Sequence, residues 1–317
     1  MGKNYVASHG KLSVRGTAIV DRAGGEVRLY GPSTLGLVWY PEFINKEAFT
    51  CVHDWGANLV RLAMYTMEED GYCSGGDKEF TKKLIDDGVR FCTELGMYAI
   101  IDWHILSDGD PRQNKEEAKC FFAEMADKYK DHDNVLFEIC NEPNPGGFNS
   151  GEEHEPVDWP VIKSYAGEII PIIREKTDAI ILIGTPTWSQ EVDKAADDPV
   201  TGYDNLMYSL HYYASTHGQY LRDKLIYALD KGLPVFVDEY SITAADGNGD
   251  INYEEADKWS ALVDERNLSC AQWSLSPRDE SSAMVKPNTG KVSGWTDDDL
   301  TDTGKWMKKR LKEAALK

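Results

Sequence analysis

The sequence has no apolar run long enough to cross a bilayer. Its longest strongly apolar stretch is about Met97 to Ile101, far short of the roughly 18 residues that a membrane-spanning helix needs. The first ten residues lack the basic segment followed by an apolar segment that marks a secretory signal. We therefore expect no integral membrane protein, and we expect that any signal peptide is absent from this sequence.

Positive charge is also scarce. Lys and Arg number 34 against 54 Asp and Glu, for a net charge of −20 over 317 residues. A protein of this sign repels phosphate backbones, which argues against nucleic acid as a partner. The 41% hydrophobic and 28% charged residues are typical of a soluble globular protein.

None of the six cysteines forms a C-x-x-C pair. This spacing argues against a zinc ribbon or a redox motif. Buried or half-buried thiols are the favoured interpretation in a chain of this length, and a disulfide stays open as the alternative.

The order of the patterns predicts a (β/α)₈ TIM barrel, an α/β fold, with a short N-terminal β-hairpin. No linker divides residues 1–317, so we expect one catalytic domain. Strand-like runs recur about every 34 residues, and an open doubly wound sheet is disfavoured because no G-x-G-x-x-G follows the first strand. The expected strand ends are Leu37, Met64, Trp103, Ile139, Ile183, Leu210, Val237 and Ser274.

Local signals place the hairpin and several helices. Residues 12–20 and 27–30 alternate around Ala23-Gly24-Gly25, which predicts a hairpin there. Helical spacing and capping residues predict the other elements. The expected helices cover residues 78–95, 116–129, 158–176, 257–265 and 298–315.

Two glutamates follow predicted strands of this barrel. Glu142 comes after an apolar run and before Pro143, and Glu239 ends the run that starts at Pro234. In such barrels, polar residues at the carboxyl ends of strands face the active site. A single glutamate at a strand end is usually a solvated loop charge, but this pair lies among other polar and aromatic strand-end residues. Those residues are Arg61, His104, His211, Tyr213 and Trp273.

Paired carboxylates with a positioning arginine and aromatic platforms suit glycosidic bond cleavage. One carboxyl must be protonated to donate to the leaving oxygen, and the other must be ionised to attack the anomeric carbon. Trp39, Trp188 and Trp273 lie near the predicted loop mouths, where they would stack on sugar faces, although core packing is the commoner use of any one tryptophan.

An ordered set of motifs resembles glycoside hydrolase family 5, in particular its bacterial endo-β-1,4-glucanases (cellulases). Asn-Glu-Pro alone is a weak signal, whereas the whole set in this order is specific. The matching stretches are Gly36–Tyr40, Asn58–Arg61, Ile101–Leu106, Phe137–Pro143, Gly184–Gln190, His211–Ala214, Phe236–Glu239 and Gln272–Leu275.

The resemblance implies roles for the matching residues. Glu142 would be the acid/base and Glu239 the nucleophile of a retaining mechanism that needs no cofactor. Asn141 would hold the sugar 2-hydroxyl, and Arg61 and Tyr213 would orient the nucleophile. The other implied substrate-binding and supporting residues are His104, His211, Trp273, Trp39, Tyr65, Trp188, Arg278 and Glu280.

The chain departs from the pattern of close cellulases at several positions. Leu35 stands where they usually have His, and Val38 where they have Gln. Arg278 lies near the usual Lys, and its planar guanidinium is not equivalent to an ammonium group. The usual Glu-Trp-Gly appears as Glu239-Tyr240-Ser241. These changes leave the predicted reaction class intact, but they leave open which glucan the protein prefers.

The loop from Asp246 to Asp257 resembles a calcium-binding loop. Its oxygen-bearing side chains include Asp246, Asn248, Asp250, Asn252 and Asp257, at positions 1, 3, 5, 7 and 12. Ile251 occupies the position where the sharp turn needs Gly. A solvated polar loop is the favoured interpretation, with a structural calcium ion as the alternative.

We therefore predict a secreted, monomeric retaining endo-β-1,4-glucanase that acts on cellulose or a related β-glucan. A relative tuned to mannan, xyloglucan, lichenan or chitosan is the alternative that Leu35 and Arg278 suggest. A catalytically inactive glycan-binding barrel is disfavoured because both glutamates are present. A metal-dependent hydrolase using His104 and His211 is disfavoured because no H-x-H or His-Asp ligand cluster is evident.

Overall fold

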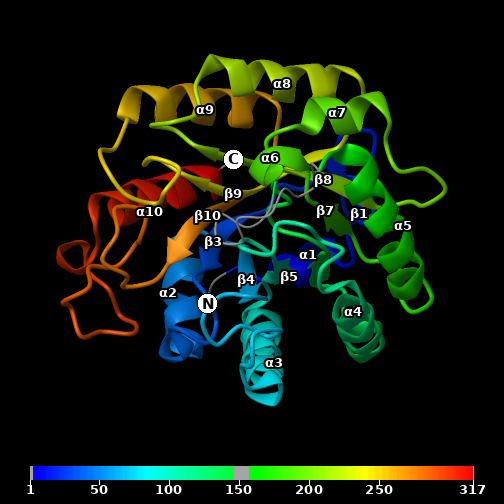
Figure 1. Ribbon diagram of the computed structural model, residues 1–317. Coiled ribbons are helices and arrows are strands. Elements are labelled where there is room, and N and C mark those ends of the chain that lie inside the picture. Colours follow the sequence, from blue (N-terminus) through cyan, green and yellow to red (C-terminus); the bar gives the residue numbers. More distant parts are fainter. Residues whose placement is uncertain (1–2, 146–156, 317) are drawn as a thin grey trace.

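Eight parallel strands close into a barrel (Figure 1). The computed structural model describes residues 3–145 and 157–316, so residues 1, 2, 146–156 and 317 of the predicted domain lie outside the described part. The barrel runs in the order β10-β3-β4-β5-β6-β7-β8-β9. Its strands are β3 (Tyr30–Thr34), β4 (Leu59–Tyr65), β5 (Tyr98–His104), β6 (Val135–Glu138), β7 (Ile181–Ile183), β8 (Leu206–Tyr213), β9 (Val235–Ser241) and β10 (Cys270–Leu275).

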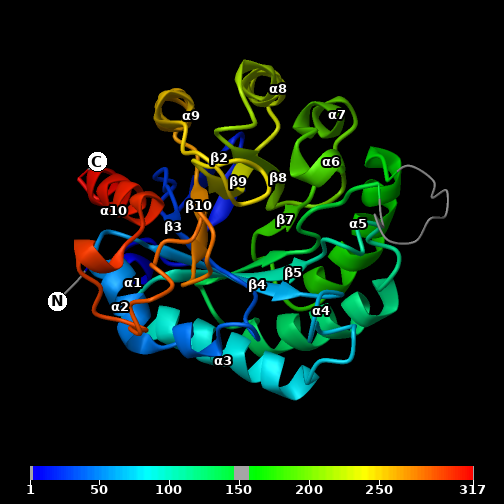
Figure 2. The same cartoon turned by 60° about the vertical axis from the view of Figure 1, so that its left-hand side comes forward.

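Helices surround this barrel (Figure 2). The predicted TIM-barrel fold is confirmed, while the extent of the domain as residues 1–317 stays a prediction. The helices are α1 (Tyr5–His9), α2 (Lys46–Asp54), α3 (Lys78–Leu95), α4 (Lys115–Tyr129), α5 (Trp159–Arg174), α6 (Pro186–Ser189), α7 (Val192–Asp197), α8 (Gln219–Asp230), α9 (Tyr253–Glu265) and α10 (Asp302–Ala314), with 3₁₀ turns at Pro41–Phe43 and Asp297–Asp299.

Helix α3 shows why the local signals worked. The Asp77 side chain accepts from the Phe80 amide at its start, and Gly96 adopts a left-handed φ of 72° at its end. The buried face of the helix includes Leu84, Ile85 and Val89, which pack onto the barrel. Its bounds therefore agree with the predicted range.

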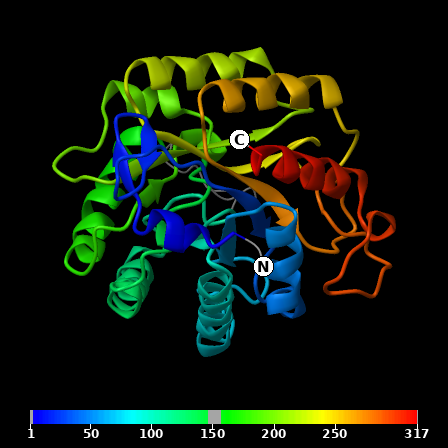
Figure 3. The same cartoon turned by 180° about the vertical axis from the view of Figure 1, so that it is seen from behind.

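The N-terminal segment closes one end of the barrel, as the view from behind shows (Figure 3). The Val6 amide donates to the carbonyl of Gly96, which precedes β5, and the Tyr98 hydroxyl donates to the carbonyl of Gly10. Leu12 packs against side chains of the barrel interior. They form a cluster that also holds Leu59, Ile100, Leu136 and Phe236. These side chains fill the barrel interior at its amino-terminal end.

The hairpin exists, but its tight turn is not where the sequence predicted it. β1 (Ser13–Arg15) pairs with β2 (Ala18–Val20) around Gly16, which has a φ of 62°. Around Ala23-Gly24-Gly25 there is a single antiparallel bridge, between Val20 and Glu26. The stretch after it leads into β3, which ends at Thr34 and not at Leu37. The Leu37 amide instead donates to the Ala63 carbonyl from the following loop.

Candidate active site

A hollow of about 350 Å³ opens among loops at the carboxyl ends of the strands. Nine of the predicted catalytic and substrate-binding residues line it, which brings together side chains from most of the barrel. They are Trp39, Tyr65, His104, Glu142, Tyr213, Glu239, Trp273, Arg278 and Glu280.

The two predicted glutamates face each other in this hollow. One carboxyl oxygen of Glu142 and one of Glu239 lie within 4.8 Å of each other, and both are within that distance of a ring nitrogen of His211. Retaining glycosidases hold their two carboxyl groups about 5–5.5 Å apart, whereas inverting enzymes hold them about 6.5–9.5 Å apart. The separation therefore fits retention.

A β-bulge aims the end of β9 into the barrel. Ser209 and His211 of β8, two residues apart, pair with Phe236 and Glu239 of β9, three residues apart. The pairing with β10 has the same extra residue, because Cys270 and Gln272 oppose Val237 and Tyr240. Regular alternation from Phe236, which packs in the barrel interior, would send Asp238 inward and Glu239 outward, but the bulge turns Glu239 inward as well.

Arg61 of β4 lies beneath the nucleophile position and is fully buried. Its Nη1 donates to Glu239 Oε2 at 3.0 Å. Nε and Nη2 donate to the two oxygens of Glu138, each at 2.7 Å, and Nη2 lies 3.0 Å from Asp102 Oδ2. Burial opposes the charge of Arg61, but these carboxyl groups outweigh it and raise its pKa well above the usual value. Arg61 is thus a fixed cation beside Glu239.

The environments of the two glutamates push their pKa values apart. Burial raises the pKa of Glu142, and the neighbouring His211 opposes this only in part. Burial also acts on Glu239, but the positive charges of His211 and Arg61 outweigh it and lower its pKa. The Tyr213 hydroxyl donates to Glu239 Oε1 at 2.7 Å and favours the same charged form. These shifts favour the protonated form of Glu142 and the ionised form of Glu239, in the sense that the chemistry requires.

Asn141 and His104 form a buried layer next to this pair. The Asn141 Oδ1 accepts from Arg61 Nη2 at 2.6 Å, and its Nδ2 donates to the Ile105 carbonyl at 3.0 Å. His104 Nδ1 lies 2.6 Å from Asp102 Oδ2. Burial and Arg61 lower the pKa of His104 to about 3, so its ring is neutral and donates through Nδ1. The sugar contact of Asn141 stays a prediction.

Aromatic rings form the walls of the hollow. Trp39 stacks on Tyr65 with ring centroids 4.4 Å apart, and its Nε1 donates to the Glu69 carbonyl. Trp273 stacks on His104 at 5.3 Å and 15°. These rings are held by their neighbours, and offer apolar faces of the kind that pack on a pyranose.

Trp188 lies in a second hollow, which shares Glu142 and Tyr213 with the first and also contains His211. Thr187, Trp188 and Ser189 have consecutive positive φ values of 58°, 54° and 54°, a strained arrangement for non-glycine residues. The Ser189 Oγ donates to the Asn141 carbonyl at 2.6 Å, and the Trp188 amide donates to the Pro143 carbonyl at 3.0 Å. The strained turn is therefore tied to the segment that carries Glu142.

Two of the departures from the family pattern also lie at the first hollow. Leu35 is 3% exposed and packs with Tyr65 and Trp273. Arg278 Nε pairs with Glu280 Oε2 at 3.0 Å, and its guanidinium lies 5.8 Å from the Trp39 ring centre. Both positions therefore contact the same cleft, one apolar and one charged.

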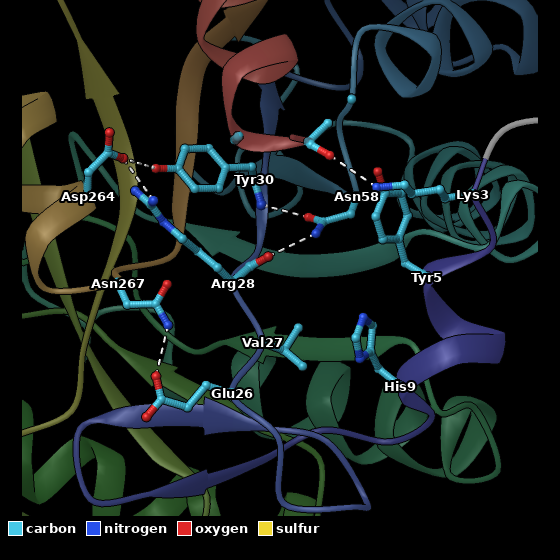
Figure 4. Close-up of a pocket in the computed structure, with 13 residues that line it drawn as sticks. Lys3, Tyr5, His9, Glu26, Val27, Arg28, Tyr30, Asn58, Asp264 and Asn267 are labelled. Atoms are coloured by element: carbon cyan, nitrogen blue, oxygen red, sulfur yellow. Dashed lines mark hydrogen bonds and ion pairs between the residues drawn. The ribbon is translucent and has the colours of Figure 1, made fainter. Parts of the chain in front are cut away.

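A further polar hollow lies at the other end of the barrel, where strands begin (Figure 4). Asn58, which precedes β4, accepts from the Tyr30 amide at 2.7 Å and donates to the Arg28 carbonyl at 2.9 Å. Asn267 donates to Glu26 at 3.0 Å. Such mutual pairing at the amino-terminal end of a barrel serves stability, so the hollow around the glutamates is the candidate active site.

The calcium interpretation of residues 246–257 stays a prediction. Asp246 Oδ1 accepts from the Asn248 amide, Asn248 Oδ1 from the Ser281 amide, and Asn252 Oδ1 from the Glu255 amide. Asn252 caps α9, which begins at Tyr253 and not at Asp257 as the sequence predicted. Asp257 therefore lies inside a helix.

Calcium binding by this loop predicts heat on titration of chelator-treated protein with calcium chloride, and a higher Tm with calcium bound. Magnesium chloride serves as the matched titrant. A flat calcium thermogram with an unchanged Tm contradicts the calcium interpretation and leaves the loop as a hydrogen-bonded polar segment.

Sequence reasoning missed part of the buried charge network. Glu138 and Asp102 bind Arg61, and Asp238 accepts from the Ser209 hydroxyl. The spacing of Asp102 and His104, two apart on one strand face, was a usable signal. Within residues 3–145 and 157–316, His104 belongs to neither cluster of three close ligand-type side chains, so a metal centre using His104 and His211 finds no support.

All six cysteines are free thiols.

A (β/α)₈ barrel with two carboxyl groups within 4.8 Å at its carboxyl-terminal end has the arrangement that glycoside hydrolases use. A family model described as cellulase (glycosyl hydrolase family 5) matches residues 20–279. The chain therefore belongs to glycosyl hydrolase family 5.

Its relatives include several bacterial endoglucanases. Endoglucanase A of Butyrivibrio fibrisolvens is 46% identical over 303 residues, covering 94% of this chain and 68% of that protein. The endoglucanase of Clostridium saccharobutylicum is 45% identical over 306 residues, covering 95% and 65%. The chain thus spans about two thirds of the length of these curated relatives.

Solved structures agree over nearly the whole chain. The cellulase Cel5C_n has a TM-score of 0.88 at 43% identity, covering 96% of this chain and 92% of that one. The catalytic domain of Thermobifida fusca endoglucanase Cel5A, solved as a variant in complex with cellotetraose, has a TM-score of 0.89 at 34% identity, covering 98% and 100%.

Proposed function

We propose that the chain cleaves internal β-1,4 bonds of cellulose or a related β-glucan with retention, using Glu142 as acid/base and Glu239 as nucleophile. The observation that carries this proposal is the pair of carboxyl groups within 4.8 Å whose pKa values are shifted in opposite directions. The family and the endoglucanase relatives support the reaction class.

In the first step, a Glu239 oxygen attacks the anomeric carbon while the glycosidic C–O bond breaks. Glu142 gives its proton to the departing oxygen, which leaves a glycosyl ester on Glu239 and an ionised Glu142. Arg61 donates a hydrogen bond to one carboxyl oxygen of Glu239 and the Tyr213 hydroxyl donates to the other, so the orientation of the attacking carboxylate is fixed.

In the second step, ionised Glu142 removes a proton from water. The water oxygen attacks the anomeric carbon, and the ester bond to Glu239 breaks. The product keeps the β configuration, and both carboxyl groups return to their starting protonation states.

The opposite pKa shifts predict a bell-shaped dependence of kcat/KM on pH. Activity needs ionised Glu239, whose pKa lies below its usual value, so the midpoint of the acidic limb should lie below about pH 4.5. Activity also needs protonated Glu142, whose pKa lies above its usual value, so the midpoint of the basic limb should lie above about pH 4.5. Initial rates on a soluble β-glucan across pH test this. A profile that rises steadily through both limbs contradicts the assignment.

A panel of polysaccharides tests the substrate class. Release of reducing ends is expected from carboxymethyl-cellulose or mixed-linkage β-glucan before mannan, xyloglucan or chitosan. Leu35→His and Arg278→Lys restore the usual family residues, so a shift of preference toward cellulose in these variants supports a tuned specificity. Higher rates on mannan or chitosan than on every glucan support the alternative β-glycanase.

Location and partners follow from this substrate. A β-glucan polymer is too large to enter a cell, so we expect the enzyme to act outside it, in polysaccharide degradation, as a monomer that needs no cofactor. In the part of the chain that the structure describes, no helix is both long and apolar enough to span a bilayer.

A further inference from the structure

Asp238 is a buried carboxyl group that the mechanism above leaves without a task. It is 0% exposed and points inward, and the bulge of β9 brings Glu239 beside it. Its Oδ2 accepts from the Ser209 hydroxyl. Its Oδ1 lies 3.3 Å from the Nε2 of His211, within ion-pair distance, and both atoms are buried without a hydrogen-bonding partner among the described residues. A proton on Nε2 would therefore face Asp238 Oδ1 across an ion-pair distance.

The other ring nitrogen of His211 faces the proposed acid. His211 Nδ1 lies 2.9 Å from Glu142 Oε1. A neutral imidazole has one N–H, so if it donates to Asp238 its Nδ1 lone pair accepts the proton of Glu142 and turns that proton away from the leaving oxygen. An imidazolium ring donates to both. When Nδ1–H binds Oε1, the acidic proton of Glu142 must sit on Oε2, which is then available to the leaving oxygen.

Charges from several parts of the barrel act on this ring. Burial opposes the charge of His211, but Glu239, Asp238 and Glu142 outweigh it and raise its pKa well above the usual value. The remaining titratable groups around it come from β4, β5, β6 and the loop after β8. They are Arg61, Asp102, His104, Glu138 and His217.

We propose that Asp238 is a positioning residue that keeps both nitrogens of His211 protonated, so that His211 directs the proton of Glu142 toward the leaving oxygen. The proposal rests on the proposed function for its kinetic consequence. Its structural core is independent of activity, because the protonation of His211 is measurable in the free protein.

The test is Asp238→Asn, which keeps the shape of the side chain and removes its charge. Without the carboxylate, His211 should lose one proton between about pH 5 and 8, and its free Nδ1 then captures the proton of Glu142. We expect kcat/KM to fall by about 10²-fold near pH 7.5, but by less than about tenfold near pH 5, where His211 is still charged. The basic limb of the pH profile therefore moves to lower pH.

NMR of isotope-labelled histidine rings, assigned with His211→Asn, gives the direct measurement. In the unaltered protein both His211 nitrogens should carry protons throughout this pH range. The matched control is Asp108→Asn, another buried carboxyl that bonds to Thr66 and Asn114 away from the two glutamates. It should keep the unaltered pH profile. Ser209→Ala retains the Asp238 charge, so it should leave His211 doubly protonated.

A uniform loss of activity at every pH in Asp238→Asn, with His211 still doubly protonated, overturns the proposal. If that variant does not fold, the spectrum of the unaltered protein decides, because a singly protonated His211 near pH 6 also overturns it. Doubly protonated His211 in a protein that cleaves no glycan supports the Asp238–His211 pair and contradicts the proposed function.

Discussion

Replacing Glu239 with Gln is expected to lower kcat by about 10⁴-fold or more, because the covalent intermediate cannot form. The amide is nearly isosteric, and its oxygen can accept from Arg61 while its NH₂ group donates to the Tyr213 hydroxyl oxygen, so the fold should survive. Reducing-end release from carboxymethyl-cellulose measures the loss. A 2-fluoro glycoside with a good leaving group should label Glu239 in the unaltered protein, and a label on another residue moves the nucleophile.

Glu142→Gln is the matched control for this prediction. It should lower the rate on polysaccharide by about 10²- to 10⁴-fold, the usual contribution of a general acid. Formation of the glycosyl-enzyme from an aryl glycoside whose leaving group needs no proton should be almost unaffected. Full activity of both variants on polysaccharide contradicts the assigned roles.

Arg61→Met is expected to lower the free energy of unfolding by about 3–5 kcal/mol, the typical cost of removing one partner of a buried ion pair. Arg61 is fully buried against Glu138, Asp102 and Glu239, so its loss leaves these carboxyl groups without their cation. The loss should lessen at low pH, where the carboxyl groups become neutral. Urea denaturation near pH 5 and pH 7.5 measures both effects.

Arg61→Lys separates charge from geometry in this site. It keeps a cation but lacks the planar fork that gives Glu138 two parallel hydrogen bonds. We expect a stability between those of the unaltered protein and Arg61→Met. Equal stability of all three proteins contradicts the view that Arg61 holds the buried carboxyl groups together.

The sequence was sufficient for the barrel and for its two glutamates because these signals are local. Helix α3 has its own caps and apolar stripe. Glu142 comes directly before Pro143, which cannot continue a strand. Helix α10 was predicted too early because Thr296 and Asp299 cap a separate 3₁₀ turn, so that the helix begins at Asp302.

Asp238 could not be assigned in this way. Simple alternation places it on the face opposite Glu239, and the bulge that reverses this depends on pairing with β8 and β10, which lie far away in the sequence. The same holds for Arg61, whose four acidic or amide partners come from three other strands and the loop after β6.

The barrel separates two kinds of change that evolution or engineering can make. Arg61 and Glu239 lie within β4 and β9, and Glu142 follows β6 closely, whereas Trp39, Trp188 and Arg278 are carried by the connections after β3, β7 and β10. Exchanging those connections with a relative should retune which polysaccharide is accepted while bond breaking is conserved. The turn at residues 187–189 is the exception, because its hydrogen bonds to Asn141 and Pro143 mean that it must be grafted together with the acid-bearing segment.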